Sequence, residues 1–343
     1  MHSCRRQNPR LLSLTFHPIV GVQARRGLLS TPFPRDQQQS STFNKEAGWT
    51  STSPSLLKVC NLAAPHTGHI RIITLNSPRN KNALSQQLLA ELEAELRRIQ
   101  SAATQEDLDW HNNRPGAVLS SGTRAIIIGS ELDGVFCAGA DLKERKDMTR
   151  QQTDDFLRRL RRTFTMIHRS DIPSISAISS IAFGGGLEMG LATHFRVFSS
   201  ATTVALPETR LGIVPGAGGT YRLGSLLGKT RALDLVLTGR RIQGEEASRL
   251  GLCDRLVGPP LDEVGDKGIK DDELRQCVLQ GAIDMAKAIC EGGPATTKPA
   301  MNMIRMGQEE VEAKEYDKVL ATEDRDEALQ AFAEKRKAVF KGK

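Results

Sequence analysis

The chain has 343 residues, of which 39% are hydrophobic and 25% are charged. A chain of this length can bury a large core, and its composition excludes a disordered or fibrous protein. It contains no apolar run of roughly 18 residues or more, so the sequence predicts no membrane-spanning helix.

The net charge of +7 is concentrated near the N-terminus. The first 60 residues hold eight basic and two acidic side chains, so the rest of the chain is nearly neutral. A nearly neutral body does not indicate a basic face for nucleic acid.

Residues 1–35 are rich in arginine, serine and leucine and contain no acidic residue. This composition predicts a mitochondrial transit peptide, and the alternative is a basic tail without a targeting role. The six cysteines form no C-x-x-C pair and have no histidine partners at zinc-ligand spacing, so they predict reduced thiols and no metal site. Reduced thiols agree with the mitochondrial matrix.

Residues 36–66 are rich in Ser, Thr, Gln and Pro and show no apolar period, so they predict a disordered linker. Order is expected to begin near His69, and the β-branched run over 70–75 predicts the first strand. A helix should then begin at Ser85, a suitable N-cap, and continue through Arg98.

The polar stretch 102–123 predicts a surface loop, and the apolar run 125–128 predicts a strand covered on both faces. Strands and helices then alternate. The further expected elements are a helix over 150–168, a strand over 175–178, a helix beginning at Gly184, short strands over 196–198 and 203–205, and helices after Gly218. This order predicts an α/β core over 67–258 and an α-helical C-terminal region over 259–343.

Glycine and carboxylate occur together in three segments, at 136–144, 183–188 and 206–219. The three consecutive glycines of the second segment allow close approach of a ligand and leave amide groups at the positive end of a helix. Amides aimed at an oxygen that gains negative charge lower a reaction barrier by about 3 kcal/mol each. Ala140, in the first segment, is a candidate for a second donor.

Glu188 and Glu208 are the candidate acid–base pair. Addition of water to an unsaturated thioester needs a carboxylate that polarises the water and a carboxylic acid that delivers a proton to the α-carbon. Both glutamates lie in apolar stretches, where burial raises a carboxyl pKa toward neutral pH. Taken singly, a glutamate like Glu188 is more often a helix-terminal acid, and one like Glu208 is more often a solvated turn residue.

Together and in this order, the three segments resemble the enoyl-CoA hydratase/isomerase (crotonase) superfamily, from about Ile70 to the C-terminus. Within it, the string NKNALS at 80–85, the string FCAGADLKER at 136–145 and the closing EKR at 334–336 are most similar to the methylglutaconyl-CoA hydratase branch. The resemblance implies a spiral of ββα turns, a helical C-terminal region that builds trimers or hexamers, and no metal or redox cofactor beyond the coenzyme A of the substrate.

The resemblance also implies individual roles. Glu188 would activate the water, Glu208 would protonate the α-carbon, and the amides of Ala140 and Gly185 would form an oxyanion hole. Further positions implied to bind the acyl-CoA are Lys81, Ala83, Ala138, Asp141, Leu142, Lys143, Gly184, Pro207 and Gly216. For Lys81 and Lys143 the alternative is a solvated surface lysine.

The chain departs from the family pattern at two places. Ser179 and Ser180 stand where a glycine-containing turn is usual, and His194 replaces an aspartate and is expected to be structural. A cation for any distal carboxylate of the substrate is not identified, with Arg210 and Arg222 as candidates.

The leading hypothesis is hydration of a short or branched enoyl-CoA in leucine or fatty-acid degradation. An enoyl-CoA isomerase or another acyl-CoA enzyme of this fold is the first alternative, and a non-catalytic or RNA-associated protein is the second. The expected helix at 85–98 has three glutamates and no lysine, so no nucleic-acid partner is expected.

Overall fold

The computed structural model describes residues 55–111, 122–259 and 270–343. The chain separates into two units, Met1–Ser53 and Pro54–Lys343, and every described residue belongs to the second unit. Within these ranges no helix is long and apolar enough to cross a membrane. The predicted transit peptide and most of the predicted linker lie outside the described residues.

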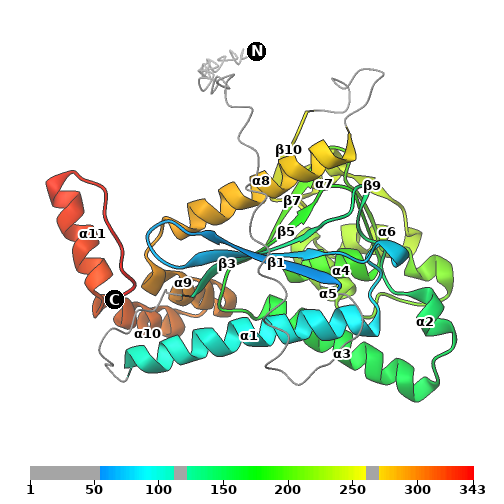
Figure 1. Cartoon of the computed structure of the whole chain (residues 1–343), viewed down its shortest axis with the longest axis horizontal. Helices are drawn as coiled ribbons and strands as arrows, with labels where there is room; N and C mark the ends of the chain where they lie inside the picture. Colours follow the sequence, from blue (N-terminus) through cyan, green and yellow to red (C-terminus); the bar gives the residue numbers. More distant parts are fainter. Residues whose placement is uncertain (1–54, 112–121, 260–269) are drawn as a thin grey trace, which may run out of the picture. The chain divides into compact units, whose positions relative to one another are not determined.

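The larger of two sheets has six strands (Figure 1). In spatial order they are β1 (Leu57–Ala63), β2 (His69–Leu75), β3 (Thr123–Ser130), β5 (Ser174–Ile178), β7 (Phe195–Ser199) and β10 (Arg255–Val257). β1 and β2 form an antiparallel hairpin, and all later neighbours are parallel. β3 and β5 are buried along almost their whole length, as expected for parallel strands covered on both faces.

The smaller sheet positions the three motifs. Its strands are β4 (Val135–Cys137), β6 (Ile181–Phe183), β8 (Thr203–Ala205) and β9 (Ile242–Gln243). β4, β6 and β8 are parallel, and each leads into one of the motif segments. Because the carboxyl ends of parallel strands meet at one edge of a sheet, the three segments come together at that edge.

Helices pack on both faces of the six-stranded sheet. The helices up to residue 290 are η2 (Pro78–Asn80), α1 (Gln86–His111), α2 (Leu142–Lys146), α3 (Arg150–His168), α4 (Gly185–Ala192), η3 (Glu208–Leu211), α5 (Gly219–Leu227), α6 (Lys229–Thr238), α7 (Gly244–Leu250) and α8 (Asp271–Cys290). On one face, Val278 and Ala282 of α8 pack against Ile127 and Ile175. The larger core cluster, on the other face, joins α1, α3, α4 and the smaller sheet.

The C-terminal region is helical, with α9 (Pro294–Met306), α10 (Glu309–Leu320) and α11 (Glu323–Glu334). The chain beyond α11 folds back onto it, because the Asp324 carboxylate accepts hydrogen bonds from the amides of Lys341 at 2.7 Å and Gly342 at 2.9 Å. The predicted α/β core with a helical C-terminal region is therefore confirmed.

Two sequence-based boundaries are wrong. The predicted linker 36–66 contains β1, so order begins before His69; β1 is an edge strand in which only Leu57 is fully buried, and it therefore shows no apolar period. The predicted loop 102–123 is helical up to His111, because α1 continues through good helix formers beyond its apolar stripe. The part of that loop at 112–121 lies outside the described residues.

The other predicted elements match closely. Ser85 is the helix cap, since its hydroxyl accepts the amide of Leu88 at 3.2 Å. The predicted helix 150–168 coincides with α3, and the predicted strands after it coincide with β5, β7 and β8 within one residue at each end. The short strands β4, β6, β9 and β10 were not predicted; runs of two or three residues give only a weak periodic signal.

Candidate active site

Glu188 lies in the first turn of α4 and is only 2% exposed. Its Oε1 atom accepts hydrogen bonds from the amides of Ala217 and Gly219, both at 2.8 Å. A side chain at position 219 would place its Cβ 3.0 Å from the Glu188 carboxyl group, so glycine allows this close approach. The segment 206–219 therefore holds the Glu188 carboxylate of the segment 183–188 through two hydrogen bonds.

Glu208 begins the short helix η3, directly after Pro207. It is 8% exposed, and its Oε2 atom is buried without a hydrogen-bond partner among the described residues. A Cβ at Gly184 would lie 3.1 Å from Glu208 Oε1, which places this carboxyl group against the start of α4. A buried carboxyl oxygen without a partner is costly unless the group is protonated or meets a ligand.

Burial affects the protonation of both carboxyl groups, and the charge of Glu188 also acts on Glu208. Burial, and to a smaller extent the charge of Glu188, raise the pKa of Glu208 to about 7, against a lowering by the residue's own amide. Burial also raises the pKa of Glu188, but the amides of Gly219 and Ala217 and the charges of Arg222 and Arg161 oppose it. The pair therefore favours a single proton held on Glu208, with Glu188 as the carboxylate.

The amides of Ala140 and Gly185 lie close together. A Cβ on Gly185 would lie 3.9 Å from the Ala140 nitrogen. The parallel bridge between Leu84 and Ala140 uses the carbonyl of Gly139 and the amide of Asp141, so the intervening Ala140 amide is not part of it. Gly185 is the first residue of α4, where no preceding turn supplies an acceptor. This geometry suits two donors aimed at one oxygen.

The loop at 80–85 lies against the first motif. The amide of Ala138 donates to the carbonyl of Lys81 at 3.1 Å, and the amide of Leu84 donates to the carbonyl of Gly139 at 2.7 Å. The Asn80 side chain also donates to Asp141 Oδ2 at 3.0 Å. Lys81, Ala83, Ala138 and Asp141, all predicted to bind substrate, therefore share one region.

Asn82 organises this loop, a role that the sequence did not assign. It is fully buried at a left-handed φ of 55°, and its side chain accepts from the Ser77 amide at 2.7 Å. It donates to the Phe136 carbonyl at 3.0 Å and to the Ser130 hydroxyl at 2.9 Å. Asparagine tolerates this backbone conformation better than most residues, which is the signal that could have identified it.

The remaining predicted positions are less closely tied to the glutamates. Leu142 and Lys143 begin α2, and the Lys143 amide donates to Asp141 Oδ1 at 3.0 Å while its side chain is exposed. The carbonyl of Gly216 accepts from Arg161 Nε at 2.6 Å. Arg210 is exposed and its Nε donates to the Thr238 carbonyl at 2.9 Å.

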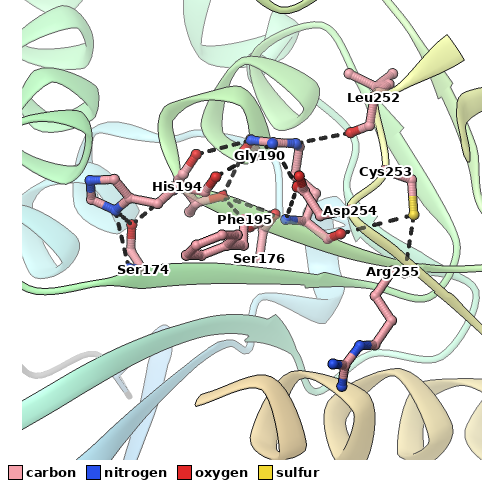
Figure 2. Close-up of polar contacts among 11 residues, drawn as sticks. Ser174, Ser176, Gly190, His194, Phe195, Leu252, Cys253, Asp254 and Arg255 are labelled. Atoms are coloured by element: carbon pink, nitrogen blue, oxygen red, sulfur yellow. Dashed lines mark hydrogen bonds and ion pairs between the residues drawn. The ribbon is translucent and has the colours of Figure 1, made fainter. Parts of the chain in front are cut away.

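His194 has the structural role expected of it (Figure 2). Its Nδ1 accepts from the Ser174 amide at 3.1 Å and lies 2.7 Å from the Ser174 hydroxyl. Burial lowers its pKa to about 4, so the ring stays neutral at physiological pH. Ser179 and Ser180 also fit without strain, because neither adopts a positive φ.

A buried arginine fixes the end of α4 that lies away from Glu188. Arg196 donates from Nη1 to the carbonyl of Thr193, the C-cap of α4, at 3.0 Å and from Nε to the Leu252 carbonyl at 2.9 Å. It is paired with Asp254 at 2.6 Å. Figure 2 shows this network around Leu252 and Asp254, next to the His194 contacts. The helix that carries Glu188 is therefore anchored at both ends.

These features define a class of protein: an α/β enzyme with a buried, electrostatically coupled pair of carboxyl groups at the edge of a small parallel sheet, next to two closely spaced amides. Such a site suits proton transfer near neutral pH next to amide donors that favour negative charge.

Comparison with known proteins agrees with this class. Residues 119–343 match the model of the enoyl-CoA hydratase/isomerase family. The chain is 48% identical over 305 residues to methylglutaconyl-CoA hydratase 1, mitochondrial, of Pyricularia oryzae, covering 84% of this chain and 87% of that protein. It is 48% identical over 311 residues to an enoyl-CoA isomerase/hydratase of Zymoseptoria tritici, covering 90% and 95%.

The fold is also shared with solved structures. An enoyl-CoA hydratase from Bacillus anthracis superposes with a TM-score of 0.68 at 34% identity, covering 84% of this chain and all of that one. The chain therefore belongs to the enoyl-CoA hydratase/isomerase (crotonase) family and is an enzyme with the crotonase fold. The predicted family and fold class are confirmed.

Proposed function

We propose that this enzyme hydrates a short or branched α,β-unsaturated acyl-CoA, with 3-methylglutaconyl-CoA as the leading substrate. The observation that carries the proposal is the pair of buried carboxyl groups in different surroundings: Glu188 is held by two amides, and Glu208 has a pKa of about 7 and an oxygen without a partner among the described residues. Two relatives whose names include hydratase, each 48% identical, support it.

In the proposed mechanism, the Glu188 carboxylate orients and polarises the water. The water oxygen bonds to the β-carbon of the thioester, and the α-carbon takes a proton from the Glu208 carboxylic acid. The proton released by the water passes to the carboxylate pair, so the pair returns to its starting state. The amides of Ala140 and Gly185 donate to the thioester oxygen while it carries enolate charge. No metal or redox group takes part in this scheme.

We further propose that the loop carrying Lys81 and Ala83 and the segment from Ala138 to Lys143 hold the coenzyme A portion. Their mutual hydrogen bonds give a preformed surface for it. Gly184 and Pro207 would border the acyl group beside Glu208, and Gly216 would lie near the water. The mitochondrial matrix is the proposed location, supported by the name of the Pyricularia oryzae relative.

An enoyl-CoA isomerase is the second candidate, because the Zymoseptoria tritici relative is named for both activities. Isomerisation moves one proton between two carbons and needs no water held by Glu188. Loss of the conjugated-thioester absorbance of crotonyl-CoA and 3-methylglutaconyl-CoA measures hydration, whereas its appearance from a 3-enoyl-CoA measures isomerisation. Hydration of neither conjugated substrate would reject the proposal.

We also propose that the enzyme assembles as a homotrimer or hexamer through its C-terminal helices. Ile304 of α9 and Phe332 of α11 are 84% and 86% exposed, a large apolar area for helix surfaces in water. The variant Phe332→Glu is expected to shift the mass measured by light scattering toward the monomer, whereas Lys314→Gln on α10 should keep the parent mass. A parent protein that is monomeric at micromolar concentration would contradict the proposal.

A further inference from the structure

The glycine-rich loop 216–219 is held by two arginines from different helices. Arg161 Nε, on α3, donates to the Gly216 carbonyl at 2.6 Å, and Arg222 Nη1, on α5, donates to the Ala217 carbonyl at 2.8 Å. The amides of the same loop, at Ala217 and Gly219, are the two donors to Glu188. Each arginine therefore donates a hydrogen bond to the loop that holds the Glu188 carboxylate.

Arg222 is a buried arginine in the first turns of α5. It is only 5% exposed, yet no carboxylate among the described residues lies within salt-bridge distance of it. Its guanidinium lies over the Tyr221 ring at 5.0 Å, and a Cβ at Gly218 would lie 2.2 Å from its Nη1. Gly218 has a φ of 106°, so only glycine suits both this backbone and this contact. Burying a guanidinium without a carboxylate costs stability, which favours a functional reason for its retention.

We propose that Arg161 and Arg222 are positioning residues, which clamp the loop 216–219 and thereby fix the Glu188 carboxylate in the orientation that holds the water. This proposal rests on the proposed hydration. Neither arginine is assigned contact with the reacting atoms. The bond from Arg161 restrains the peptide unit that carries the Ala217 amide, and the bond from Arg222 restrains the next peptide unit, which lies between the two amides that donate to Glu188.

The charged groups that face Glu188 come from three elements: Arg161 on α3, Glu208 on η3 and Arg222 on α5. The strands β4 and β6, which also contact α4, bring only the Cys137 thiol, whose pKa burial raises to about 12. Both arginines lower the pKa of Glu188. Loss of either charge should therefore raise that pKa and make the carboxylate form scarcer at low pH.

The variant Arg161→Gln tests the clamp, with Arg158→Gln as its matched control. Arg158 lies on the same helix, is exposed and forms an ion pair with Asp155. Arg161→Gln is expected to lower kcat by about 10-fold at unchanged KM, because small displacements of a positioning group are costly. The acidic limb of its kcat profile should move to higher pH. Arg158→Gln should behave like the parent, and Arg161→Lys, which keeps a donor and the charge, should recover most of the loss.

A second readout does not depend on activity. In protein labelled with ¹³C at the glutamate carboxyl carbons, the Glu188 signal is assigned by its absence in Glu188→Gln. In Arg161→Gln this signal should titrate at higher pH than in the parent, and in Arg158→Gln it should not move. Unchanged titration together with unchanged kcat would overturn the clamp even if the parent is a hydratase. A parent that hydrates no enoyl-CoA would instead reject the proposed function and leave the titration as the test of the clamp.

Arg222 is tested by Arg222→Lys, which keeps the charge but loses the planar fork. We expect kcat to fall while the thermal unfolding temperature stays the same as that of the parent. Because a buried substitution can unfold the protein, the exposed Arg161 variants decide the proposal whether or not Arg222→Lys folds.

Discussion

Replacing Glu188 with glutamine is expected to lower kcat for hydration by about 10³-fold while the fold is kept. The glutamine oxygen can still accept the amides of Ala217 and Gly219, so the side chain should stay in place. The neutral amide cannot polarise the attacking water as a carboxylate does. Steady-state kinetics with crotonyl-CoA and 3-methylglutaconyl-CoA, together with thermal unfolding, would measure both parts of the prediction.

The matched control is Glu310→Gln, the same chemical change at an exposed position in α10. It should leave kcat, KM and the unfolding temperature as in the parent. If Glu188→Gln keeps more than about a tenth of the parent kcat, the assignment of Glu188 as the water-activating carboxylate is wrong. A fall in kcat that accompanies a lower unfolding temperature would indicate a structural effect instead.

The variant Glu208→Gln is expected to lose activity and gain stability at the same time. The α-carbon would lose its proton donor, and a loss of about 10³-fold in kcat is expected. In the parent, burial raises the folded-state pKa of Glu208 to about 7. Ionising this group above pH 7 therefore costs the folded state at most about 3 kcal/mol, a cost that a neutral glutamine avoids.

The sign of the pH dependence follows from that raised pKa. The stability contributed by Glu208 is present below the carboxyl pKa of the unfolded chain and is lost as pH rises through about 7. The unfolding free energy of the parent should therefore fall between about pH 5 and pH 8 more steeply than that of Glu208→Gln. The parent kcat should also fall above pH 7, because the acid form becomes scarce, and this limb belongs to the coupled pair.

Denaturant unfolding at pH 5 and pH 8 and a kcat profile over the same range check both expectations. Glu208→Gln that is as active as the parent would contradict its role as proton donor. A variant with no gain in stability at pH 8 would contradict the raised pKa. Glu310→Gln again serves as the control. Removing an exposed carboxylate should change neither the pH dependence of the unfolding free energy nor that of kcat.

The long elements of the fold could be predicted because their signals are local. The helix α3 and the strands β3 and β5 have apolar patterns that fit one secondary structure only, and burial follows from them. The edge strand β1 could not be predicted this way, because almost all of its side chains stay exposed and its pairing with β2 supplies the stability. The end of α1 was placed too early because the helix continues beyond its apolar stripe.

The candidate residues Glu188, Glu208, Ala140 and Gly185 could be named from the sequence, because glycine and carboxylate recur beside apolar strands and resemble one family. The chemical difference between Glu188 and Glu208 could not be predicted from the sequence. Both glutamates lie in similar apolar surroundings along the chain, and only the amides of Ala217 and Gly219, about thirty positions further on, distinguish them. The contribution of Arg161 was equally hidden, because α3 shows several similar arginines.

The sequence by itself determined the family, the alternation of strands and helices and the identity of the two glutamates, since each of these depends on residues that are neighbours in the chain. The tertiary structure decided the different surroundings of the two glutamates, with two amide donors and two arginine charges at Glu188 and a pKa of about 7 at Glu208. The physical reason is that a carboxyl pKa depends on burial and on donors and charges within a few ångströms, and here those groups come from α3, α5 and η3, which approach α4 only in the folded molecule.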